Sequence, residues 1–144
     1  MFKKIAVAYN GSPEARRALA QAIDLAKALG AELHAITVLE DLPPYAAFAA
    51  AADSTLAVTL IEDAQDQCKL LHSEARQGAL GKGVELHTHL LEGDPCESIV
   101  RFLMDTKTDL VVIGLHRNTS HISRLWSTVY ELALDAPCSV LGVH

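Results

Sequence analysis

Residues 109–129, DLVVIGLHRNTSHISRLWSTV, carry the strongest structural pattern in this chain of 144 residues. The apolar run Leu110–Ile113 predicts a strand buried on both faces, as in a parallel sheet with helices on each side. Gly114 ends that run. Thr128, with Glu131 three residues later, forms a capping-box pattern, which predicts that a helix begins at Thr128. A strand, a glycine, a polar loop and a helix start together place backbone N–H groups around an anion.

The rest of the chain alternates between short apolar strands and helices whose apolar residues recur at spacings of three and four. The expected strands cover residues 4–9, 32–39, 84–91, 110–113 and 138–143. Strands that alternate with helices imply right-handed crossovers and a parallel sheet. The sequence therefore predicts one α/β domain over residues 1–144, built on a doubly wound parallel sheet.

Two helix starts are marked by a capping residue followed by proline. Ser12 and Pro13 begin a helix that Gly30 ends, and Asp94 and Pro95 begin another. Proline suits the first helical position because its missing N–H would have no partner there.

Residues 46–52 consist of alanine with one phenylalanine and follow two adjacent prolines. We interpret them as a loop that leads into a helix capped by Asp53 or Ser54. The apolar face of that helix continues up to Gly78, where we expect it to end.

The order of these motifs resembles the universal stress protein (UspA) family over nearly the whole chain. The resemblance rests on the Gly-Ser turn after the first strand, Gly93-Asp-Pro95, Asp109–Gly114 and Asp135-Ala-Pro-Cys138. It implies a five-stranded sheet in the order 3-2-1-4-5, the adenine-nucleotide alpha-hydrolase-like fold. In that order the winding reverses between strands one and four, which is where such sheets bind ligands.

Many members of this family carry a motif after the fourth strand that wraps the phosphates and ribose of ATP. It reads Gly, two residues, Gly, nine residues, then Gly with Ser or Thr. Laid on this chain without a gap, it begins at Gly114, but its other two glycines fall on Arg117 and Ser127, and its hydroxyl on Thr128. Bare backbone is what lets N–H groups approach an anion, so the loss predicts weakened or absent ATP binding.

Two interpretations of this loop stay open. One is a structural loop in which Thr128 only caps a helix. The other is a nucleotide crevice in which Arg117 replaces a lost contact, because a guanidinium pairs directly with phosphate. The candidate crevice consists of Asn10, Val38, Gly114, Arg117, Ser127 and Thr128.

Asn10 departs from the family, which usually has aspartate there, near the nucleotide and its metal. Asparagine keeps a carbonyl oxygen but lacks the negative charge that Mg²⁺ prefers, so we expect weaker binding of the metal ion that accompanies the nucleotide. Asn10 also suits a turn before Gly11. Val38, at the end of the second strand, is expected to flank the same crevice.

Composition excludes several kinds of partner. The chain has 12 basic and 18 acidic residues and a net charge of −6, so a nucleic-acid partner is not expected. No segment approaches the roughly 18–20 apolar residues that cross a membrane. Its three widely spaced cysteines, Cys68, Cys96 and Cys138, fit a reducing compartment. We therefore expect a cytoplasmic protein without a membrane segment.

No recognisable catalytic or metal motif appears. The seven histidines lack the spacing of a zinc site, although His87 and His89 share one strand face and His116 stands at the mouth of the crevice. Cys96 follows a helix start, which lowers a thiol pKa, but an inert buried thiol is favoured. We expect no catalytic residue, no metal and no resident cofactor, with ATP as the alternative that the resemblance leaves open.

The last strand, Ser139–Val143, is apolar and lies at a sheet edge, and such edges pair with another copy. The resemblance implies antiparallel pairing of this strand in a homodimer. The leading hypothesis is thus a non-enzymatic cytoplasmic stress-response homodimer with weakened or absent ATP binding. The alternatives are an ATP or AMP sensor of the same family with at most slow ATP hydrolysis, and a small enzyme on the same scaffold.

Overall fold

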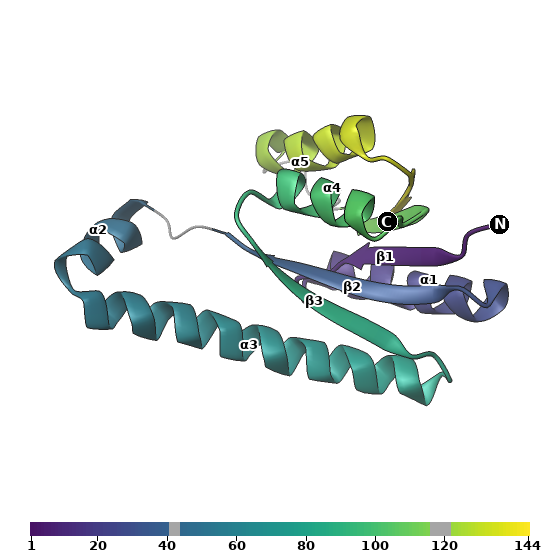
Figure 1. The fold of residues 1–144 in the computed structure, drawn as a ribbon, viewed down its shortest axis with the longest axis horizontal. Helices are drawn as coiled ribbons and strands as arrows, with labels where there is room; N and C mark the ends of the chain where they lie inside the picture. The colour runs from purple at the N-terminus through teal and green to yellow at the C-terminus, as the bar shows by residue number, and fades with distance from the viewer. Residues whose placement is uncertain (41–43, 116–121) are drawn as a thin grey trace.

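A computed structural model describes residues 1–40, 44–115 and 122–144 of the chain. Five parallel strands form one sheet in the order β3-β2-β1-β4-β5, as predicted (Figure 1). The elements in chain order are β1 (Lys4–Ala8), α1 (Pro13–Leu29), β2 (Glu32–Leu39), α2 (Pro44–Ala52), α3 (Ser54–Gly81), β3 (Leu86–Glu92), α4 (Pro95–Asp105), β4 (Leu110–Gly114), α5 (Ile122–Asp135) and β5 (Ser139–Val143).

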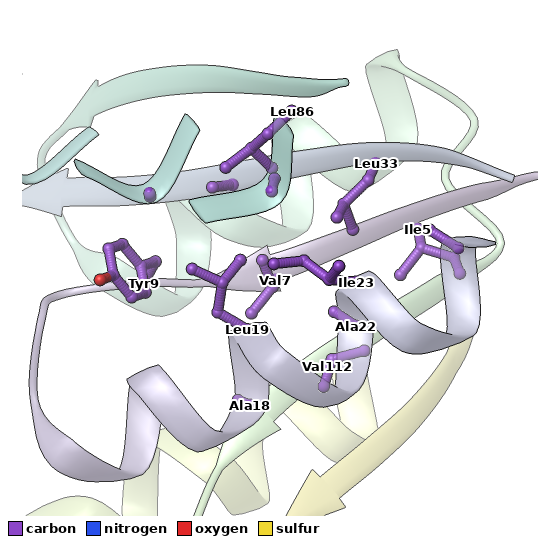
Figure 2. Packing of buried hydrophobic residues seen from close by; sticks show 14 of the residues in the cluster. Ile5, Val7, Tyr9, Ala18, Leu19, Ala22, Ile23, Leu33, Leu86 and Val112 are labelled. Carbon is purple, nitrogen blue, oxygen red and sulfur yellow. The ribbon is translucent and has the colours of Figure 1, made fainter. Parts of the chain in front are cut away.

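Helices cover both faces of the sheet, and each face has its own apolar core. On one face, Leu19 and Ile23 of α1 pack with Val7 of β1, as Figure 2 shows, and α3 completes this layer. On the other face α4 and α5 pack against the sheet through Leu103 and Leu132. Alternate residues of β1 and β4 feed the two cores, which explains their unbroken apolar sequences.

The predicted caps of α1 and α4 are confirmed. The Ser12 hydroxyl accepts a hydrogen bond from the Ala15 N–H at 3.2 Å. Gly30 ends α1 in the left-handed conformation at φ 64°. The Asp94 carboxylate accepts from the Glu97 N–H at 3.0 Å. These contacts satisfy N–H groups that have no partner inside the helix.

The interpretation of residues 46–52 as a loop is wrong, because they belong to helix α2. Alanine has the highest helix propensity, and Pro44 takes the first helical position, where proline is tolerated. Of the two residues expected to cap the next helix, Asp53 does so, and its side chain accepts from the Thr55 N–H at 3.0 Å. That helix continues through Gly78 to Gly81. One glycine costs only about 1 kcal/mol in a helix of this length.

The predicted helix start at Thr128 is also wrong, because α5 begins at Ile122. The apolar spacing of Ile122, Leu125, Val129 and Leu132 already follows one helical face, and this longer periodicity overrides the capping-box pattern. No helix among the described residues is long and apolar enough to cross a membrane.

Candidate functional site

A pocket of about 400 Å³ opens at the carboxyl ends of β1, β2 and β4, where the winding of the sheet reverses. This is the position at which doubly wound sheets bind ligands. Its walls combine apolar strand ends with the first turns of α1 and α4. The lining residues are Ala8, Tyr9, Asn10, Ser12, Glu14, Ala15, Ile36, Val38, Glu40, Pro95, Ile99, Ile113, Gly114 and Val129.

Three of the six predicted crevice residues line this pocket: Asn10, Val38 and Gly114. Arg117 lies outside the described residues, as do His116 and the loop around it. Ser127 and Thr128 belong to α5, and the described structure covers their backbone only. The three strand-end positions were predictable because a parallel sheet gathers its carboxyl ends at one edge.

Asn10 has a defined role in the turn after β1. Its side-chain oxygen accepts a hydrogen bond from the Ser12 N–H at 3.0 Å. Gly11 follows at φ 79°, and a Cβ there would stand 2.7 Å from Leu71 Cδ1. Arg16 Nε donates to the Gly11 carbonyl at 3.0 Å. The turn therefore uses one lone pair of the Asn10 oxygen, and a neutral amide offers a metal ion less than a carboxylate would.

Gly114 is required by packing between β4 and α1. A Cβ at this position would stand 2.5 Å from the carbonyl carbon of Glu14 and 2.9 Å from the Ala15 nitrogen. Both are backbone atoms, which cannot move aside as a flexible side chain would. The glycine allows the first turn of α1 to approach the end of β4, and this explains its presence without a ligand.

The start of α5 changes what the backbone near Ser127 and Thr128 can do. These are the sixth and seventh residues of the helix. Beyond the first four residues, each helical N–H bonds to the carbonyl four residues earlier. The two N–H groups are therefore committed inside α5, whereas an anion site needs those of a helix start.

Two carboxylates, Glu14 and Glu40, are the charged groups among the described lining residues. Glu14 lies in the first turn of α1, and its side chain already interacts with other groups of the protein. The Ala15 N–H at the same helix end is taken by Ser12. Negative charge on the pocket wall opposes an anionic ligand, so the described walls suit an apolar or uncharged group better than a triphosphate.

The comparisons with known proteins agree with this fold. The model of the universal stress protein family matches residues 1–144. The chain belongs to the universal stress protein family. It is 34% identical over 145 residues to a universal stress protein of Methanocaldococcus jannaschii, covering 99% of this chain and 82% of the relative.

Solved structures of universal stress proteins have the same architecture. One from Burkholderia pseudomallei is 25% identical, with a TM-score of 0.76, covering 99% of this chain and 96% of that one. A universal stress protein solved with cAMP has 23% identity and a TM-score of 0.71, covering 99% and 97%. One from Archaeoglobus fulgidus, solved with dAMP, has 22% identity and a TM-score of 0.67, covering 99% and 98%.

Within this universal stress protein fold, a buried polar group joins α3 to the end of β1, and the sequence analysis missed it. Thr37 Oγ1 donates to the Tyr9 carbonyl at 2.6 Å and lies 2.6 Å from His72 Nε2. Since the hydroxyl has one proton, His72 Nε2 must donate to it. Cys68 Sγ lies 3.6 Å from the same nitrogen. The spacing of Cys68 and His72, four apart on one helix face, was the available signal.

A second histidine group lies on the opposite face of the sheet, at the β3 edge. His34 Nε2 lies 2.7 Å from a Glu32 oxygen, and His34 Nδ1 lies 2.8 Å from His89 Nε2. The carboxylate can only accept, so His34 donates to it and accepts from His89. The His34 ring also stacks on the His87 ring, and the two ring centroids are 4.9 Å apart. The predicted shared face of His87 and His89 is thus correct.

These contacts favour neutral histidines. Burial lowers the pKa of His34, His72 and His89, although the Glu32 hydrogen bond opposes this at His34. Across residues 1–40, 44–115 and 122–144, no group of three or more His, Cys, Asp or Glu side chains is arranged to hold a metal ion.

The three cysteines are all free, and none has the character of a nucleophile. Burial raises the pKa of Cys96, and the nearby Glu131, Asp135 and Asp94 raise it further. Burial also raises the pKa of Cys68 and Cys138. A thiol with a raised pKa stays protonated, so the helix start at Pro95 does not activate Cys96.

Proposed function

We propose that this protein is a non-enzymatic, cytoplasmic stress-response protein that acts as a homodimer and binds ATP weakly or not at all. Family membership supports the stress-response role. The single observation that carries the weakened ATP site is the start of α5 at Ile122. This start commits the N–H groups of Ser127 and Thr128 to the helix, at the positions where the family motif has its last glycine and hydroxyl.

The remaining candidate crevice residues support the same proposal. Asn10 is engaged in a turn, and Gly114 is explained by the approach of α1. The charges on the described pocket walls are negative. Arg117 is the one candidate that favours phosphate, through its guanidinium.

A second candidate function is binding of an adenine nucleotide or nucleoside in the same pocket. Two structural relatives were solved with cAMP and dAMP, both of which contain adenine. The apolar residues Ile36, Val38 and Ile113 provide walls for a flat ring. In this case the ligand is held mainly by its base, with at most slow hydrolysis of ATP.

The homodimer is proposed to form through β5, the strand at the second edge of the sheet. Residues 139–143 carry no charge, and Leu141 is exposed. An uncharged, unshielded edge strand offers N–H and C=O groups to a second copy. Antiparallel pairing of two β5 strands would continue the sheet across a two-fold axis.

Thermal unfolding with added ligand tests the function. A ligand that binds only the folded chain stabilises it by RT ln(1 + [L]/Kd). With ATP and Mg²⁺ at about 1 mM, a dissociation constant above about 1 mM gives less than about 0.4 kcal/mol of stabilisation. We expect that small effect for ATP. A Val38→Trp variant, whose larger side chain occupies part of the pocket without adding charge, is the control for any stabilisation by AMP or adenosine.

A further inference from the structure

The exposed face of α2 carries apolar side chains at the spacing that helices normally bury. Tyr45, Phe48, Ala49 and Ala52 lie at positions i, i+3, i+4 and i+7 and therefore share one face. All four are exposed, Tyr45 by 80% and Phe48 by 82%. We call this set the α2 stripe. Figure 1 shows that α2 lies beyond the end of the sheet, at the start of α3.

The helix that carries the stripe is short. It has nine residues and packs on α3. Isolated helices below about 12–15 residues are marginal in water, so packing must hold such a helix in place. The side chains of α2 that the structure describes are all exposed, those of the α2 stripe included. A partner on the stripe would add the missing apolar burial.

Charge narrows the kind of partner. Between Asp41 and Glu62 the only charged residue is Asp53, although the whole chain has a net charge of −6. Two copies that approach each other through the negatively charged parts of their surface repel each other. The surface around the α2 stripe has almost no charge and avoids that repulsion. The sequence has no lysine or arginine between Lys27 and Lys69, so nothing here attracts an anionic membrane.

We propose that the α2 stripe is an interface between two copies of this chain, with the two α2 helices packed antiparallel. A two-fold axis between Phe48 and Ala49 places each Phe48 opposite the other copy's Ala49. The same axis places each Tyr45 opposite the other copy's Ala52. Each aromatic ring then faces a methyl group, and such alternation of large and small side chains lets two helix faces interdigitate. The stripe is thus complementary to itself, as a two-fold interface requires.

The two exposed aromatic side chains supply part of the area that such a contact needs. At about 200 Å² for a whole aromatic residue, Tyr45 and Phe48 expose roughly 320 Å² together, against about 800 Å² per partner in a standard interface. Leu56, Val58 and Ile61, at the start of α3, are also exposed.

Molecular mass in solution tests the interface with Phe48→Glu, measured by light scattering over a concentration series. Because Phe48 is exposed, the variant is expected to fold. At a concentration where the wild type is fully associated, Phe48→Glu should halve the weight-average mass. Leu80→Glu, at an exposed position in the last turn of α3, is the matched control and should leave the mass unchanged. A wild type that stays monomeric, or a Phe48→Glu mass equal to that of the wild type, overturns the proposal.

A second variant separates this interface from the proposed β5 dimer. Leu141→Lys places a charge on the β5 edge and should leave association through α2 intact. If Leu141→Lys abolishes all association while Phe48→Glu has no effect, the α2 interface is wrong and the β5 dimer stands. If only Phe48→Glu reduces the mass, the α2 interface stands alone.

Cross-linking gives an independent readout of the antiparallel geometry. Ala49→Cys lies next to the proposed axis, so two copies should form an interchain disulfide under mild oxidation. Ala47→Cys, an exposed position outside the stripe, should not. Equal cross-linking of the two variants would contradict the proposed packing.

Discussion

The β1–α1 junction and the segment of α2 with the start of α3 use the same helical signals with different results. In both, a polar residue caps a helix, and apolar residues recur at spacings of three and four. Around the junction these residues are buried, and Asn10, Ser12 and Gly114 each have a defined contact. In residues 44–61 the same spacing leaves aromatic rings exposed. Apolar periodicity therefore predicts a helix, but it does not say whether the apolar face meets the chain's own core.

The largest expected difference between the two regions is in side-chain truncation. Leu19 of α1 is buried beside the junction, so Leu19→Ala should lower the free energy of unfolding by about 2–5 kcal/mol. Phe48→Ala removes a larger but exposed side chain and should change it by less than about 0.5 kcal/mol in the dissociated chain. Urea denaturation at low protein concentration measures both. Similar losses for the two variants would mean that Phe48 is part of the core.

Glycine replacement should have opposite effects beside the junction and farther along α3, where the helix surface is open. Gly114→Ala forces a methyl group against the α1 backbone and should cost about 1–3 kcal/mol. Gly78→Ala, inside α3 with no atom near the new Cβ, should stabilise by up to about 1 kcal/mol. Opposite signs in chemical denaturation support the packing explanation for Gly114. If Gly114→Ala left the free energy of unfolding unchanged, the packing explanation for Gly114 would be wrong.

Acid should weaken the junction through His72. Burial lowers its pKa in the folded chain, so the folded state binds fewer protons than the unfolded state. This contribution to stability is complete above the unfolded pKa of about 6.5 and is lost as the pH falls below it. The urea midpoint should therefore fall between pH 7.5 and 5.5, and His72→Gln should reduce that fall. An unchanged pH dependence in His72→Gln would exclude His72 as a cause.

The smallest expected contrast concerns two aspartate caps. Asp94→Ala should cost about 1 kcal/mol, because α4 is packed on the sheet and cannot fray freely. Asp53→Ala should cost less in global unfolding, because the first turn of α3 is exposed and can open locally. Hydrogen exchange should show faster opening near Thr55 in Asp53→Ala. A global loss as large as that of Asp94→Ala would show that this part of α3 unfolds with the core.

Much of the fold was predictable because its signals are local. Ser12 with Pro13, and Asp94 with Pro95, mark helix starts by the hydrogen bonds that they make within three residues. The strand run Leu110–Ile113 reveals burial on both faces. Residues 46–52 were predicted to be a loop because a run of alanines has no alternation of apolar and polar residues to indicate a helix. Their high helix propensity forms α2 without such a pattern.

The candidate site was less predictable, because it depends on contacts between distant segments. Nothing near Gly114 in the sequence shows that the Glu14 backbone passes beside it. The Thr128–Glu131 pattern satisfied the rule for a helix start, but α5 had begun at Ile122. The His34–His89 contact depends on strand register, which alternation in a single strand does not reveal.

Isothermal titration calorimetry with ATP and Mg²⁺ tests the central claim most directly, with adenosine titrated in parallel. The structure predicts that ATP binds no more tightly than adenosine, because α5 withholds the backbone N–H groups of Ser127 and Thr128 from the phosphates. Micromolar ATP binding, at least about tenfold tighter than adenosine, would contradict the account.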